Sequence, residues 1–149
     1  MSQPESTIEP DMIPYGMKAA LLCLEDGPWR TGAAAFFKEL GYYLMDEPDP
    51  ARAAARLRLN AVDAVVLGEA MREPLAEMHA RPGLRRREAA LFVVGTAPSL
   101  DAWAAFVSGA DWTLAQADAP RCAELLAEAL KRQDGMREPW RLAEAARGA

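Results

Sequence analysis

The stretch Val65-Val66-Leu67-Gly68 decides the fold class of this chain. It ends an apolar run that begins at Val62 and is too short for a core helix. A short apolar run without helical spacing is typical of a strand that is buried on both faces. Such strands occur in parallel sheets that have helices on both sides. The stretch therefore indicates a central strand of an α/β domain.

Four further apolar runs have the same character, and helical patterns separate them. Between the first two, Ala33, Phe36 and Phe37 recur at the spacing of one helix face. A helical crossover between strands requires parallel pairing. The sequence thus predicts a doubly wound, flavodoxin-like α/β fold, with a five-stranded parallel sheet in the order 2-1-3-4-5 and sites at the carboxyl ends of strands 1 and 3. The expected strands are residues 19–24, 42–45, 62–67, 89–94 and 112–115.

Two helices in the second half of the chain have recognisable ends. Ser99 is the expected N-cap of a helix that precedes the fifth strand, and Leu100, Trp103 and Val107 recur along it at the spacing of one apolar face. The last helix is predicted to begin at Pro120. A break in the helical pattern is expected at Asp134-Gly135.

Composition limits the classes of function. At 149 residues, with 51% hydrophobic and 26% charged residues, the chain fits one globular domain. The net charge of −5 disfavours nucleic-acid binding, which depends on neutralising phosphates. No apolar run approaches the roughly 20 residues that a membrane span needs, and residues 1–15 lack the pattern of a signal peptide. A cytoplasmic location without membrane contact is therefore expected.

The chain divides into three segments. Residues 1–16 carry prolines among acidic residues and are expected to form a disordered leader or a linker. Residues 17–133 hold the predicted sheet and form the domain. Residues 134–149 extend beyond it with a helical pattern that includes Trp140. This tryptophan is expected to cover the domain or to dock against a second subunit.

No cofactor or catalytic constellation is recognisable. Cys23 and Cys122 have no CxxC neighbour, so we expect two small buried hydrophobes rather than a zinc site or a disulfide. Glu25 and Asp26 follow the first strand where a flavin phosphate loop would be rich in Ser, Thr and Gly, and carboxylates repel a phosphate. A GxGxxG nucleotide loop is absent. His79 has no nucleophile or acid placed for a triad, so the chain is not expected to be an enzyme.

Five segments, in this order and with matching spacings, resemble the receiver domain of bacterial response regulators. The resemblance covers residues 18–132 and implies the same five-stranded fold. Each segment lies on or next to a predicted strand. The segments are Leu22-Cys23-Leu24-Glu25-Asp26, Leu40-Gly41-Tyr42, Asp63-Ala64-Val65-Val66-Leu67, Phe92-Val93-Val94-Gly95-Thr96-Ala97 and Gly109-Ala110-Asp111.

The resemblance implies a pocket at the carboxyl edge of the sheet. In the family, two acids after strand 1 and an aspartate that ends strand 3 hold Mg²⁺, and that aspartate accepts the phosphoryl group. A hydroxyl after strand 4 and a lysine after strand 5 bind the phosphoryl oxygens. Carried over by position, Glu25 and Asp26 match the acids and Thr96 matches the hydroxyl. The acceptor position falls on Gly68 and the lysine position on Gln116.

Two of these five groups are therefore missing. Glycine offers neither a ligand nor a nucleophile, and Gln116 (or Ala115, if the register shifts by one residue) offers no positive charge. The resemblance thus implies a degenerate receiver pocket without a metal ion. A slip that made Glu69 the acceptor would turn every side chain of the strand to the opposite face. Glu69 is instead either a permanent negative charge that imitates a phosphorylated state or a solvated loop carboxylate.

Other residues are candidates for partner contact. Arg85, Arg86 and Arg87 form a basic run, which is either a solvated loop or a grip for a phosphate or a carboxylate-rich partner. Trp103 and Trp140 are aromatic anchors on helical segments. The resemblance implies pairing through the fourth helix, fifth strand and fifth helix, which receiver relatives use. The C-terminal tail is the other predicted surface for a homodimer.

These observations lead to one hypothesis and two alternatives. The chain is predicted to be a non-catalytic, receiver-like signalling or scaffolding module of bacterial type, which acts through protein–protein contacts without aspartyl phosphorylation. The first alternative is an atypical receiver that accepts a phosphoryl group through an unusual site. The second is a small-ligand binder at the crevice between strands 1 and 3.

Overall fold

The computed structural model of the protein describes residues 8–81 and 88–148. Within them, strands pair in parallel in the order β2-β1-β3-β4-β5, which confirms the predicted fold class and strand order. The register pairs Cys23 with Leu67 and Gly68 with Val94, so the carboxyl ends of the central strands meet at one edge. The strands are β1 Ala19–Cys23, β2 Tyr43–Asp46, β3 Ala64–Gly68, β4 Ala90–Gly95 and β5 Trp112–Ala115.

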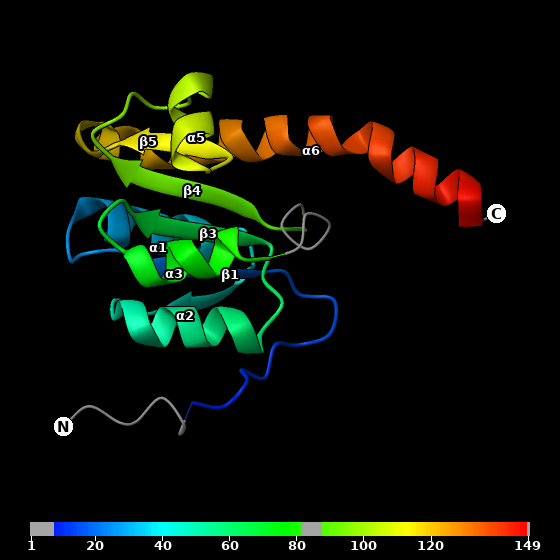
Figure 1. Ribbon diagram of the computed structural model, residues 1–149, viewed down its shortest axis with the longest axis horizontal. Coiled ribbons are helices and arrows are strands. Elements are labelled where there is room, and N and C mark those ends of the chain that lie inside the picture. Colours follow the sequence, from blue (N-terminus) through cyan, green and yellow to red (C-terminus); the bar gives the residue numbers. More distant parts are fainter. Residues whose placement is uncertain (1–7, 82–87, 149) are drawn as a thin grey trace.

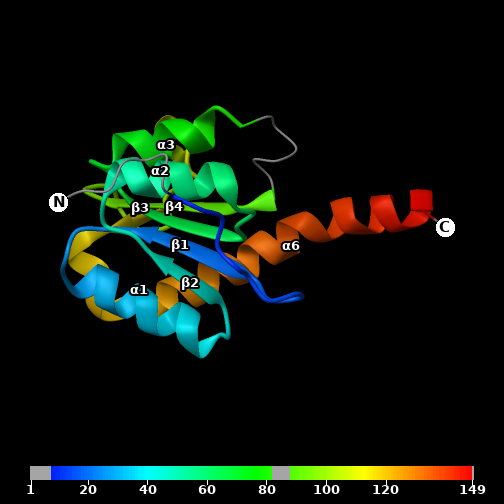
Figure 2. The same cartoon turned by 90° about the horizontal axis from the view of Figure 1, so that it is seen from below.

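Helices connect the strands and cover both faces of the sheet. They are α1 Pro28–Glu39, α2 Pro50–Leu59, α3 Arg72–His79, α5 Ala102–Ser108 and α6 Cys122–Gly148, with a 3₁₀ turn, η2, at Gln116–Arg121. Helices α1 and α6 pack on one face, and α2 and α3 pack on the other (Figure 1, Figure 2). Helix α5 lies beside β5, at the edge of the sheet (Figure 1).

The core lies on both sides of the central strands. Phe37 and Phe92 are fully buried on the face covered by α1 and α6. Leu21, Leu57 and Met78 are fully buried on the opposite face. Because both faces are covered, the strands are continuous apolar runs rather than alternating patterns. Burial of each such side chain contributes about 1.5–3 kcal/mol to folding.

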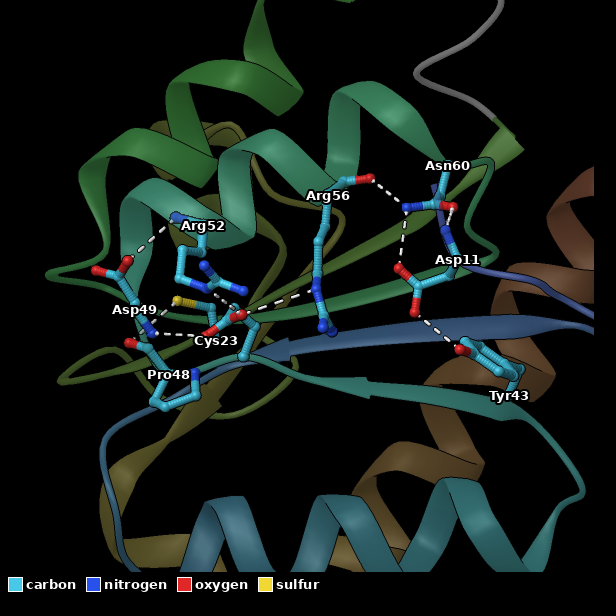
Figure 3. A network of polar contacts seen from close by, with 9 residues as sticks. Asp11, Cys23, Tyr43, Pro48, Asp49, Arg52, Arg56 and Asn60 are labelled. Carbon is cyan, nitrogen blue, oxygen red and sulfur yellow. Dashed lines mark hydrogen bonds and ion pairs between the residues drawn. The ribbon is translucent and has the colours of Figure 1, made fainter. Parts of the chain in front are cut away.

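Part of the predicted leader lies against β2 and α2. The backbone N–H of Asp11 donates to Asn60 Oδ1 at 2.8 Å, and the Asp11 carboxylate accepts from the hydroxyl of Tyr43 at 2.8 Å (Figure 3). Ile13 packs, partly buried, against the core on the same side. These contacts join residues 11–13 to the domain.

A buried carboxylate lies between α2 and the end of β1. Glu47 accepts from Arg52 Nε at 3.1 Å, and its charge lies close to the thiol of Cys23. Burial, followed by the charge of Glu47, raises the pKa of Cys23 to about 12. Burial alone raises the pKa of Cys122 to about 11. Both thiols are buried and protonated at neutral pH, so both cysteines pack as small hydrophobes.

The start of α5 differs from the prediction. Ser99 is not its N-cap; Asp101 is, and its carboxylate accepts from the N–H of Ala104 at 2.8 Å. Leu100 has a φ of +56°, in the left-handed region, and so cannot belong to the helix. The reason is a tertiary contact, because the N–H of Leu100 donates to the carbonyl of Thr113 in β5 at 2.7 Å.

The last helix also differs from the prediction. Pro120 lies in η2, before α6 begins. Helix α6 then runs without interruption to Gly148, so the break expected at Asp134-Gly135 is wrong. One glycine inside a helix costs only about 1 kcal/mol relative to alanine, and no heavy atom crowds Gly135. The C-terminal part of α6 extends beyond the sheet (Figure 1, Figure 2).

Some of the predicted contact residues lie outside the described part of the chain. Arg85, Arg86 and Arg87 are not among the described residues, and neither is the side chain of Trp140. The roles suggested for these four residues therefore stay predictions. Within the described ranges, no helix combines the length and the apolarity that crossing a bilayer requires.

Candidate functional site

A pocket of about 290 Å³ opens at the carboxyl edge of the sheet. Its walls come from the loops that follow β1, β3 and β4 and from the start of η2. This is the edge at which doubly wound sheets bind ligands. The five residues predicted for the degenerate receiver pocket all line it: Glu25, Asp26, Gly68, Thr96 and Gln116.

Glu25 and Asp26 are exposed at the mouth of this pocket. The preceding Leu24 is buried in the core, so β1 enters the loop with its two acids directed to solvent. Among the described residues, no group of three or more acidic, histidine or cysteine side chains is placed to hold a metal ion. Arg30 Nε lies 3.1 Å from the carboxylate of Asp46. The hydrogen bond and the charge of Asp46 raise the pKa of the Arg30 guanidinium, and the charge of Asp26 raises it to a smaller extent.

Gly68 ends β3, and space is not the reason for a glycine there. A Cβ at this position would lie 3.6 Å from Met71 Cγ and 4.0 Å from the carbonyl oxygen of Cys23, which are ordinary contacts. Its φ does not lie in the left-handed region. The backbone would therefore accept an alanine or an aspartate.

The Glu69 side chain crosses from the end of β3 to the end of β4. Its Oε2 lies 3.2 Å from the backbone nitrogen of Thr96 and 3.5 Å from the Thr96 hydroxyl, and it accepts from both. The backbone N–H of Glu69 donates to the carbonyl of Val94 at 2.9 Å. The carboxylate lies over Gly95, where the Cβ of any other residue would overlap it. The sequence indicated Glu69 and Thr96 separately, but nothing in their spacing pointed to Gly95.

Trp29 is a pocket residue that the sequence did not indicate. This buried side chain of α1 lines the pocket, and its indole N–H donates to the carbonyls of Ala115 and Gln116 at 3.0 and 3.1 Å. The Gln116 side chain is exposed, and the contact to Trp29 is made by its backbone. The indole thus fixes the chain at the end of β5. The signal that the sequence offered for Trp29 was its place directly after Pro28, the proline that opens the helix.

The loop from Thr96 to Asp101 is tied to the open edge of β5. Thr113 donates from its hydroxyl to the carbonyl of Pro98 at 2.7 Å and accepts from Leu100 N–H at its own carbonyl. Ser99 Oγ accepts from the N–H of Ala115 at 2.8 Å. These bonds occupy edge groups of β5 that another strand would otherwise pair with.

Helix α5 carries an exposed apolar surface, which we call the α5 patch: Trp103, Phe106 and Val107. Their exposed fractions are 73%, 77% and 67%, and the rings of Trp103 and Phe106 stack with centroids 5.7 Å apart. The apolar face predicted for this helix therefore points to solvent, and Ala105 is the residue that the helix buries. The helix starts at Ala102, after Leu100, whose φ lies in the left-handed region.

Comparison with known proteins bears on the fold. No protein-family model matches the chain, and no curated protein matches its sequence. A solved structure, that of the chemotaxis response regulator CheY4 of Vibrio cholerae, is similar with a TM-score of 0.59 over 78% of this chain and 99% of that chain. The two sequences are 18% identical, so this similarity establishes a receiver-like fold and nothing further.

Proposed function

We propose that this chain is a receiver-like signalling or scaffolding module that acts through protein–protein contacts without aspartyl phosphorylation. One observation carries the proposal. The end of β3 offers Gly68 in place of a carboxylate, while the neighbouring Glu69 occupies the donors of Thr96. A phosphoryl group would lack its acceptor and would meet a negative charge at the hydroxyl that should bind it.

The charge of the pocket supports the same proposal. Glu25, Asp26 and Glu69 all line it, and the lysine position holds the neutral Gln116. Three carboxylates without a lysine would repel a phosphoryl donor. A divalent cation would lack the central ligand that completes a near-octahedral oxygen set.

The α5 patch is the contact surface that we propose. Of the α-helices with described bounds, α5 is the one without a charged residue. The chain carries a net charge of −5, so two copies repel each other, and a contact through an uncharged helix avoids placing further like charges face to face. A stacked Trp103–Phe106 pair is the kind of aromatic anchor that is enriched at interfaces. A homodimer through α5, β5 and α6 therefore fits this surface. The C-terminal tail, residues 134–149, is the second proposed surface.

Incubation with acetyl phosphate and Mg²⁺, followed by intact-mass spectrometry, tests the proposal. We expect no phosphoryl adduct, and no Mg²⁺ affinity tighter than about millimolar by calorimetry, because the central ligand is missing. An adduct on Glu69 or Asp26 would favour the alternative of an atypical phosphoryl-accepting receiver. Mapping by peptide fragmentation separates a specific site from scattered modification.

A small-ligand binder is the second candidate, and the pocket itself favours it. The volume of about 290 Å³ lies at the lower end of the range for ligand sites. Native mass spectrometry of the freshly purified protein tests this candidate. A bound small molecule that Trp29→Ala abolishes would support it, since Trp29 lines the pocket.

A further inference from the structure

We propose that Glu69 is a permanent internal ligand of the pocket and a positioning residue for the α5 patch. This inference rests on the proposed function, because it says how a module that is not phosphorylated keeps its contact surface in place. The Glu69 carboxylate occupies the anion-binding donors of Thr96, and the chain that leaves Thr96 leads directly to α5.

Glu69 is held at its backbone and at its carboxylate. Its backbone is fixed by the hydrogen bond to Val94, so the side chain starts from a defined point beside β4. Its carboxylate then reaches Thr96 across Gly95. Hydrogen bonds to a charged acceptor are stronger than neutral ones. The contact therefore joins the loop after β3 to the loop after β4.

The loop that follows Thr96 connects β4 to α5. The loop is bound to β5 through the carbonyl of Pro98, the hydroxyl of Ser99 and the N–H of Leu100. Asp101 ends this loop and caps α5. Glu69 holds the beginning of the same segment. Loss of its contact frees one end of a loop whose other end orients Trp103 and Phe106.

A substitution at Gly95 can displace the Glu69 carboxylate without removing its charge. In Gly95→Ala the new Cβ would overlap the Glu69 carboxylate, which is the far end of a flexible side chain and can swing away. The variant thus moves the carboxylate off Thr96 while it leaves every charge in the chain unchanged. Glu69→Ala removes the carboxylate altogether. Glu69→Gln keeps an acceptor oxygen of the same reach.

Amide hydrogen exchange measured by NMR on the full chain tests the inference. In Glu69→Ala and Gly95→Ala, we expect exchange at Thr96, Leu100 and Ala104 to rise roughly three- to tenfold, as loss of one exposed hydrogen bond would produce. Glu69→Gln should restore most of the protection. A rise that is confined to Thr96 would contradict the positioning role, because Ala104 reports the cap of α5.

Two matched variants serve as controls. Glu25→Ala removes the same kind of side chain from the same pocket, and Gly68→Ala adds a Cβ in ordinary contact with its neighbours. Neither should change exchange in the loop from Thr96 to Asp101. Equal effects in controls and test variants, or no effect in either, would overturn the inference. Phosphorylation of the parent by acetyl phosphate would overturn the proposed function instead, and the exchange data do not depend on it.

Discussion

Two glycines of the pocket have opposite steric surroundings, and their substitutions should have different consequences. A Cβ fits at Gly68 in ordinary contact, whereas a Cβ at Gly95 would displace the carboxylate of Glu69. The end of β3 therefore has room for a side chain that Gly68 does not supply, whereas the absence of a Cβ at Gly95 leaves the space that the Glu69 carboxylate fills. Both glycines fit a pocket in which the Glu69 carboxylate is a built-in negative charge.

Gly68→Asp tests whether this position is the acceptor site. The new carboxylate would stand beside Glu25, Asp26 and Glu69, and like charges held close raise one another's pKa values and destabilise the folded state. We expect the melting temperature without metal to fall by a few degrees, which corresponds to a loss of about 1 kcal/mol in the free energy of unfolding. Mg²⁺ should restore part of the loss by binding the folded state. The variant should still be phosphorylated poorly, because Gln116 supplies no positive charge.

Gly68→Asn is the control for this prediction, because it has nearly the same shape without the charge. Its melting temperature should not respond to Mg²⁺, and differential scanning calorimetry compares the two variants directly. If the melting temperature of Gly68→Asp also ignores Mg²⁺, Gly68 does not occupy the acceptor position, and its assignment to that position is wrong.

Helix α5 shows where prediction from sequence stops. The sequence indicated a helix at this place, since Leu100, Trp103 and Val107 have helical spacing. It starts later than expected, after Leu100, whose N–H donates to the carbonyl of Thr113 in β5. Such a contact leaves no local signal, so the prediction placed Trp103 on an apolar face without knowing that this face is exposed.

The double variant Trp103→Ala, Phe106→Ala tests the α5 patch. Both side chains are largely exposed, so the melting temperature should stay within about 2 °C of the parent, as expected for surface changes within ±0.5 kcal/mol. Self-association, measured by sedimentation velocity over a concentration series, should weaken at least about tenfold, because buried aromatic anchors contribute upward of 1 kcal/mol each. Leu40→Ala changes an exposed apolar residue after α1 and should leave association unchanged. A dimer of unaltered strength in the double variant would exclude this patch as the interface.

The molecule as a whole follows its sequence wherever burial alone decides. The central strands are buried on both faces, so their apolar runs predicted the strands, and the helical patterns between them predicted a parallel, doubly wound sheet. The resemblance to receiver domains placed Glu25, Gly68 and Thr96 at one pocket, and the structure brings these three residues together at the carboxyl ends of those strands. The link between Glu69 and Thr96 was not predictable, because a side-chain carboxylate meets the backbone and the hydroxyl of a residue 27 positions away.

Truncation of α6 tests the tail, provided that the cut spares Gln133. The indole N–H of Trp112 donates to Gln133 Oε1 at 2.7 Å in a buried bond. Ending the chain after Arg132 orphans this donor and should cost about 1–3 kcal/mol by denaturant unfolding, whatever the tail does. Ending it after Gly135 keeps the bond and removes only the segment that starts at the exposed Met136. We expect the longer form to retain the parent's stability but lose oligomeric mass in light scattering, and Gln133→Ala in the full chain to reproduce only the stability loss. If the longer form keeps both its stability and its mass, the tail takes no part in assembly.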